Sequence, residues 1–237
     1  MTMDSDTNLI IRYQFIFQDD RTIDYTIHLN PVTCEFIPPE RSHIPGWCKL
    51  DYLKCKNCSK QEDGIDYCPP AVNSIDLIEL FKDVRSYDIV DVIVETTERK
   101  YFKNKTTIQR TLGSLFGIIM VSSGCKELDK LRPMVRFHLP FATIEETVYR
   151  TTSMYQLAQY LRSKRGLEPD LDMKVLLSIY QKIHEINVNF VRRLQKATEM
   201  DANLNAVAIL DTFSQMIPLG IKDTLKDFEN LFSPYLE

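Results

Sequence analysis

Six cysteines are the residues of this sequence whose type and spacing could do chemistry. Cys55 and Cys58 form a Cys-x-x-Cys pair, with Cys48 before it and Cys68 after it. Two thiolates at this spacing can bind one zinc ion through a turn, while the remaining ligands come from farther along the chain. The pattern therefore predicts a metal site that contains Cys55, Cys58 and Cys68.

The spacing of the cysteines does not identify the fourth ligand. Cys48 is nearest in sequence, and Cys125 follows the predicted end of a helix at Gly124. His43 and His138 are weaker candidates. A site with three cysteines and a water would be an unusual hydrolytic centre, so a structural role for the metal is favoured over a catalytic one.

An iron–sulfur cluster is the alternative cofactor. Cys68-Pro69 resembles the Cys-Pro that closes ferredoxin ligand runs, but the other spacings do not follow the ferredoxin patterns. Zinc is therefore preferred to iron–sulfur. The third interpretation is a set of free or redox-active thiols.

A second group of polar residues surrounds the segment between Pro133 and Pro140. An anionic ligand could be held by Arg and His side chains at the junction of sheet and helices. Ion pairs that fix this junction are the commoner arrangement, and an enzymatic centre at Arg136, His138 and Glu146 is a less favoured option. The candidate ligand-binding residues are Arg132, Arg136, His138, Glu146 and Arg150.

Composition excludes several classes of protein. The chain has 237 residues, a net charge of −4 and 44% hydrophobic residues, which is typical of a soluble protein and not of a nucleic-acid binder. No apolar run is expected to span a bilayer, so no membrane partner is predicted. The polar start of the chain does not resemble a signal peptide, which predicts a reducing cytoplasm where cysteines bind metal more readily than they form disulfides.

The first part of the chain has the pattern of a small antiparallel sheet. Residues 9–18 and 21–30 alternate apolar and polar side chains about Asp19-Asp20, which predicts a β-hairpin. Residues 31–70 predict an irregular loop, and residues 74–84 predict a helix. Two more strands are expected at 88–97 and from Tyr101.

The second part of the chain predicts helices. The first is expected at 108–121, and the second begins after Thr143 and ends near Gly166. The third begins at Asp170 or Asp172 and has an apolar seam from Leu176 to Leu194. Two short helices are expected at 201–216 and 221–232. The predicted fold class is α+β: a small ββαββ-like antiparallel sheet with a metal-binding cysteine loop, then an α-helical bundle. The predicted regions are 1–105, with the cysteine loop at 31–70, and 106–237, sharing one core.

The sequence also resembles an uncharacterised bacterial protein family of unknown function. The resemblance covers most of the chain and is carried by Cys55-x-x-Cys58, Cys68-Pro69-x-Ala71-Val72-Asn73, Ser123-Gly124-Cys125, Leu131-Arg132-Pro133-Met134-x-Arg136-Phe137-His138-Leu139-Pro140-Phe141, Glu145-Glu146-Thr147, Ser153-Met154-Tyr155 and Asp201-Ala202-x-Leu204-Asn205-Ala206. It brings no activity with it. It implies Cys125 rather than Cys48 as the fourth ligand, because the position after Trp47 need not be cysteine in that family.

Together these patterns predict a non-enzymatic, cytoplasmic protein that zinc stabilises and that binds a protein partner or a small ligand. A thiol or iron–sulfur redox protein is the alternative. The seam from Leu176 to Leu194 can face another helix of the same chain or form a homodimer.

Overall fold

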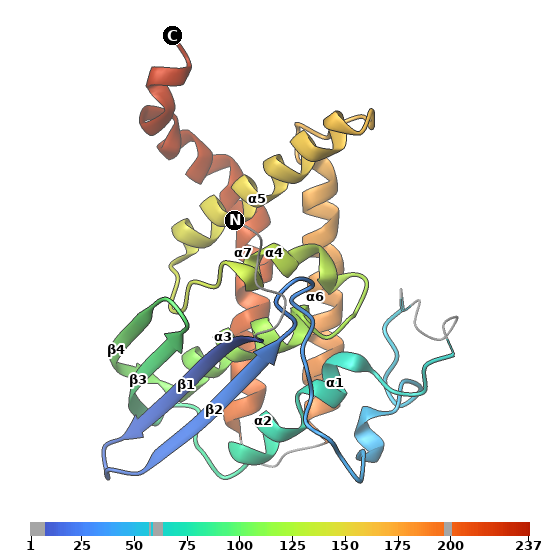
Figure 1. Cartoon of the computed structure of the whole chain (residues 1–237), viewed down its shortest axis with the longest axis vertical. Coiled ribbons are helices and arrows are strands. Elements are labelled where there is room, and N and C mark those ends of the chain that lie inside the picture. Colours follow the sequence, from blue (N-terminus) through green and yellow to red (C-terminus); the bar gives the residue numbers. More distant parts are fainter. Residues whose placement is uncertain (1–7, 57, 59–63, 197–200) are drawn as a thin grey trace.

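The computed structural model describes residues 8–56, 58, 64–196 and 201–237, and the side chains of 222–224 are left aside. Residues 57 and 59–63 of the predicted cysteine loop therefore lie outside the described part. A four-stranded antiparallel sheet occupies one side of the molecule and helices occupy the other (Figure 1). The α+β fold class with an antiparallel sheet is confirmed.

The sheet has the strand order β2-β1-β3-β4, so the two hairpins pair through their first strands. Its strands are β1 (Leu9–Phe17), β2 (Thr22–Leu29), β3 (Ile89–Thr96) and β4 (Lys100–Thr107). Alternate residues of β1 point inward, and Ile11, Tyr13, Phe15 and Phe17 are at most 5% exposed. The predicted alternation therefore identifies the face that packs on the helices.

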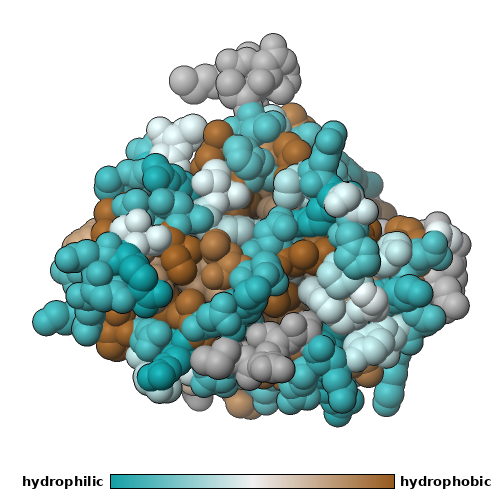
Figure 2. Space-filling view, turned by 90° about the horizontal axis from the view of Figure 1, so that it is seen from below, coloured by the Kyte–Doolittle hydropathy of each residue, from teal (hydrophilic) through white to brown (hydrophobic). Residues whose placement is uncertain are grey.

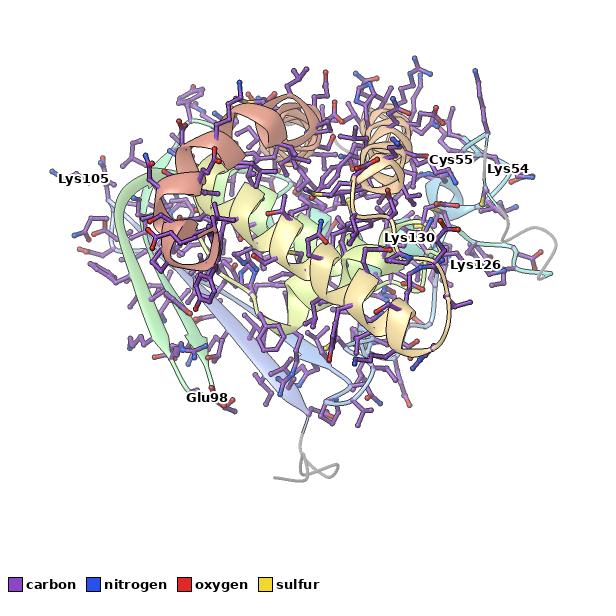
Figure 3. All side chains as sticks on the ribbon, turned by 90° about the horizontal axis from the view of Figure 1, so that it is seen from above. Lys54, Cys55, Glu98, Lys105, Lys126 and Lys130 are labelled. Carbon is purple, nitrogen blue, oxygen red and sulfur yellow. The ribbon has the colours of Figure 1, made fainter. Side chains whose placement is uncertain are left out.

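The helices pack on that buried face (Figure 3). They are α1 (Pro69–Asn73), α2 (Ile75–Leu80), α3 (Ile108–Val121), α4 (Arg132–Arg136), α5 (Ile144–Lys164), α6 (Lys174–Leu194) and α7 (Asp201–Phe232), with short 3₁₀ turns at Gly46–Cys48, Leu128–Leu131 and Ser233–Tyr235. The helix predicted at 74–84 is shorter than expected, since α2 ends at Leu80. A separate short helix, α1, precedes it and meets it at Ser74.

Helix α3 is central to the core. Leu112, Leu115 and Phe116 are fully buried between the sheet and α7. At Gly113 a Cβ atom would lie 3.1 Å from the carbonyl oxygen of Ala206, so any larger residue would require α7 to move by a few tenths of an ångström. One cluster of buried residues includes side chains from the sheet, the loop and the helices.

Helix α7 corrects the prediction of two short helices. It continues from Asp201 to Phe232 with Pro218 inside it. Proline removes one helical hydrogen bond, but Ile217 and Ile221 on either side of it are buried and hold the helix together. Among the described residues, the stretch Asp201–Ile221 is long and apolar enough to cross a membrane, which the sequence analysis did not expect. Core helices of soluble proteins can have the same length and composition, and α7 packs against α3 and α6, but only 28% of the most apolar window of this stretch is buried.

The apolar seam of α6 is buried within the protein. Leu176 and Leu194 are fully buried, and Ile183 and Phe190 between them are at most 5% exposed, as expected of a helix that packs against α7. The seam is therefore internal, and a homodimer would need another surface. Figure 2 shows that hydrophilic side chains cover much of the face seen from below, with hydrophobic surface exposed between them near its centre.

Candidate functional site

Four of the six cysteines line one small pocket. Its volume is about 50 Å³, and it is bordered by Cys55, Cys58, Cys68 and Cys125. The other walls are apolar or charged side chains: Leu50, Pro69, Pro70, Lys126, Glu127, Lys182, Glu185 and Ile186. The Cys-x-x-Cys turn and the start of α1 thus meet the distant segment after α3, against α6.

Backbone geometry places each of these cysteines. The N–H of Cys58 donates to the carbonyl of Cys55 at 3.1 Å, which closes the Cys-x-x-Cys turn. The N–H of Cys68 donates to the carbonyl of Cys48 at 2.8 Å, and Cys68 directly precedes α1. Cys125 follows Gly124, whose φ of +81° turns the chain in the left-handed region three residues after the last residue of α3, Val121. Figure 3 shows Cys55 and Lys126 on the same flank of the molecule.

Burial controls the charge of these thiols. It raises the pKa of Cys55 to about 11 and raises the pKa of Cys68 and Cys125 as well, and neighbouring thiolates add to each of these shifts. Backbone N–H groups act in the opposite direction: that of Ala71 donates to Cys68, and those of Glu127 and Leu128 donate to Cys125. The Arg193 cation also lowers the pKa of Cys68, but burial outweighs these opposing effects at all three sulfurs.

The two remaining cysteines lie elsewhere. Cys48 is fully buried and does not border the pocket, and burial raises its pKa to about 12. Cys34 is 4% exposed, as expected for a packed thiol, and lies near Arg132 and Arg136. Within the described residues, no three or more His, Cys, Asp or Glu side chains are grouped as metal ligands, so the metal site stays a prediction.

A larger cavity lies among α3, α4, α6 and α7. Its volume is about 200 Å³, and most of its lining is aliphatic or aromatic. Two of the predicted ligand-binding residues, His138 and Arg150, border it. The Arg150 guanidinium donates to the carbonyl oxygens of Met134 and Phe137 at 3.0 and 2.7 Å.

The other three predicted residues have different surroundings. Arg132 forms ion pairs with Asp129 at 2.9 Å and with Glu35 at 3.6 Å. Glu146 accepts a hydrogen bond from the N–H of Thr143 and completes the capping box of α5. Arg136 lies near Cys34 and does not border the cavity. The five residues therefore do not form one pocket.

A comparison with known families identifies the chain. Residues 11–233 match a domain of unknown function, DUF6901. The chain belongs to this family. The resemblance to an uncharacterised family is thereby confirmed. No curated protein and no solved structure matches this DUF6901 chain.

Sequence reasoning missed two buried polar residues of the DUF6901 chain. Arg193 is 2% exposed and Asn187 is 1% exposed, both on α6. Asn187 lies four residues after Ile183 and Arg193 lies three residues after Phe190, which places both on the buried stripe. Polar residues at stripe positions were the signal that could have identified them.

His138 lies in a polar chain inside the DUF6901 fold. Its Nε2 is 2.6 Å from the Tyr13 hydroxyl, which is 3.0 Å from the Ser114 hydroxyl. Burial, with a smaller contribution from the Arg150 cation, lowers the pKa of His138 to about 3. The imidazole is therefore neutral in the folded protein.

This burial predicts acid sensitivity. Unfolding returns the pKa of His138 to about 6.5, so the unfolded chain binds an extra proton between pH 3 and 6.5, and the stability of the fold falls as the pH falls through that window. Between pH 6.5 and pH 5 the free energy of unfolding is expected to fall by roughly 1.5–2 kcal/mol less in His138→Gln than in the wild type, as measured by urea unfolding. The same replacement at exposed His43 is the control. Identical pH profiles for wild type and His138→Gln would contradict the prediction.

Proposed function

We propose that this DUF6901 protein is a non-enzymatic, cytoplasmic binding protein whose cysteine loop is held in place by a structural zinc ion. The proposed ligands are Cys55, Cys58, Cys68 and Cys125. The observation that carries the proposal is that these four thiols, from three separate segments, border the same pocket, whereas Cys34 and Cys48 do not. This set agrees with the preference for Cys125 that the family resemblance implies.

The surroundings favour a structural ion. Four thiolates complete a tetrahedral shell, so no position is left for a water or a substrate. Leu50, Pro69 and Pro70 cover the pocket with apolar groups, and backbone N–H groups point at two of the sulfurs. Such donors stabilise the thiolate form that binds a metal.

A bound ion would stabilise the cysteine loop. Between β2 and α1 the regular structure of the described residues is limited to a 3₁₀ turn and two isolated bridges, Leu29 with Phe36 and Lys49 with Tyr67. Scattered backbone hydrogen bonds hold the rest of the segment, and a metal that joins it to Cys125 after α3 would add stability.

The redox alternative has weaker support. A reactive cysteine needs a lowered pKa without any metal, whereas burial raises the pKa of Cys55, Cys68 and Cys125. A zinc ion, by contrast, would itself deprotonate the thiols that bind it. An iron–sulfur cluster would use the same four sulfurs, so metal analysis has to separate it from zinc.

Metal analysis tests the proposal. Protein purified without oxygen and measured by plasma mass spectrometry is expected to contain one zinc per chain and to be colourless. Stoichiometric iron with visible absorption would replace zinc by an iron–sulfur cluster. A preparation without any stoichiometric transition metal would contradict the proposal.

The binding half of the proposal concerns the 200 Å³ cavity. It is a concave, largely apolar site with a few polar groups, which is the usual character of a small-molecule site. His138 and Arg150 give it the polar groups that the sequence analysis expected for an anionic ligand. A protein partner stays a second option, without a surface assigned to it.

A further inference from the structure

The side chain of Asn187 is an unsatisfied polar group at the wall of the cavity. It is 1% exposed, borders the cavity, and neither its Oδ1 nor its Nδ2 has a hydrogen-bond partner. A buried amide without partners costs free energy, so such a group in a native fold calls for a ligand or a water. The cavity beside it has room for more than one water.

The charge of the lining selects the kind of ligand. Arg110 and Arg150 border the cavity, together with the neutral His138 and Tyr180, and no Asp or Glu is among the described residues that line it. Arg150 donates to two carbonyl oxygens, and the described residues show no ion pair between it and a carboxylate. Burial lowers the pKa of Arg150, although the charge of Glu146 acts in the opposite direction, so the cation is poorly solvated. An anionic group in the cavity would pair with this side chain directly.

The size of the cavity limits the ligand. A dry cavity of about 150 Å³ accepts benzene, so 200 Å³ accommodates about eight to ten non-hydrogen atoms. Tyr180 and Asn187 both border it and are seven residues apart on α6, or about 10 Å along the helix axis. That length suits an extended chain of about eight carbons better than a compact ring.

We infer that the cavity binds a small apolar carboxylic acid, with its carboxylate at Arg150 and its chain directed along α6 toward Asn187. This inference rests on the binding half of the proposed function and does not depend on zinc. The apolar chain replaces empty space beside Ile183 and Leu210. The Asn187 end accommodates a polar substituent, such as a terminal hydroxyl group.

Calorimetric titration with matched probes tests the inference. Octanoate, octan-1-ol and octylammonium share one chain and differ in charge. Octanoate is expected to bind at least about tenfold more tightly than octan-1-ol, because Arg150 adds a charged hydrogen bond, and octylammonium is expected not to bind. Replacing the terminal methyl group by a hydroxyl, as in 7-hydroxyheptanoate, keeps ten non-hydrogen atoms and is expected to tighten binding further, and Asn187→Leu is expected to remove that gain. Equal binding of octanoate and octan-1-ol, or no binding of octanoate, would overturn the inference.

Two variants separate binding from folding. Arg150→Met is expected to remove the preference for octanoate. Gly117→Leu is expected to fill the cavity and abolish binding while the protein stays folded, because a Cβ at Gly117 meets only Leu210 Cδ1 at an ordinary 3.5 Å and leucine favours a helix. Octanoate that still binds Gly117→Leu, shown to be folded by circular dichroism, would place the ligand elsewhere and overturn the inference.

Zinc content is measured on the same samples. A zinc-loaded protein that does not bind octanoate contradicts this inference and leaves the zinc proposal standing. A zinc-free protein that binds octanoate supports the inference and contradicts the zinc proposal.

Discussion

Cys125→Ala is expected to release the zinc ion and to lower the free energy of unfolding by at least about 4 kcal/mol at saturating zinc. An ion present at a thousand times its dissociation constant contributes that amount by linkage, and structural zinc sites commonly bind more tightly. Cys125 is the only cysteine outside the loop region, so its loss also removes the metal link between the loop and the segment after α3. Zinc content and urea unfolding measure the two effects.

Cys48→Ala is the matched control. Cys48 is fully buried near the same loop but does not border the cysteine pocket, so this variant is expected to keep its zinc. Some stability is lost because a buried sulfur is removed, and that loss sets the baseline for Cys125→Ala. The opposite result, zinc lost from Cys48→Ala and kept by Cys125→Ala, would make Cys48 the fourth ligand.

Arg193→Leu is expected to destabilise the protein by about 3 kcal/mol or more, because it removes a buried side chain that donates to three partly buried carbonyl groups. Arg193 donates from α6 to the carbonyls of Lys49 and Leu53 at 2.7 and 2.8 Å, and also to that of Trp47. Its guanidinium also lies over the Tyr52 ring, 5.8 Å from the centroid. One side chain thus attaches the segment before Cys55 to the helices.

The same substitution tests how the loop supports the metal. If Arg193 positions the segment that leads into Cys55, Arg193→Leu is expected to weaken zinc binding about tenfold or more in a chelator competition. Its exposed neighbour provides the control, since Arg192→Leu is expected to change stability by no more than about 0.5 kcal/mol. An Arg193→Leu protein as stable as Arg192→Leu would show that the carbonyls find other donors.

Sequence patterns correctly predicted the elements that depend on residues close together in the chain. The alternation of β1 marked its buried face, and the bounds of α3 agree with those expected from Ile108 to Val121. At Thr143 the structure has a complete capping box with Glu146, as acidic residues after a threonine suggest. Each of these features depends on residues within one or two turns of each other.

The errors arose where packing outweighs local preference. Pro218 and Gly220 predict a break, yet α7 continues, because its burial against α3, α5 and α6 offsets the hydrogen bond that proline removes. The five residues of the predicted ligand group have different surroundings for a related reason. Glu146 caps α5 and Arg132 pairs with Asp129, so local contacts separated residues that lie close in sequence.

The order of strands and helices and the types of candidate ligand follow from the sequence by itself, since short-range periodicity, caps and thiol spacing carry them. Only the tertiary structure shows that Cys125 lies beside the loop and that Asn187 borders an apolar cavity. It also shows that Arg193 of α6 binds the carbonyl groups of Trp47 and Leu53. These meetings join residues far apart along the chain. They depend on how α6 and α7 pack against α3, which no local pattern specifies.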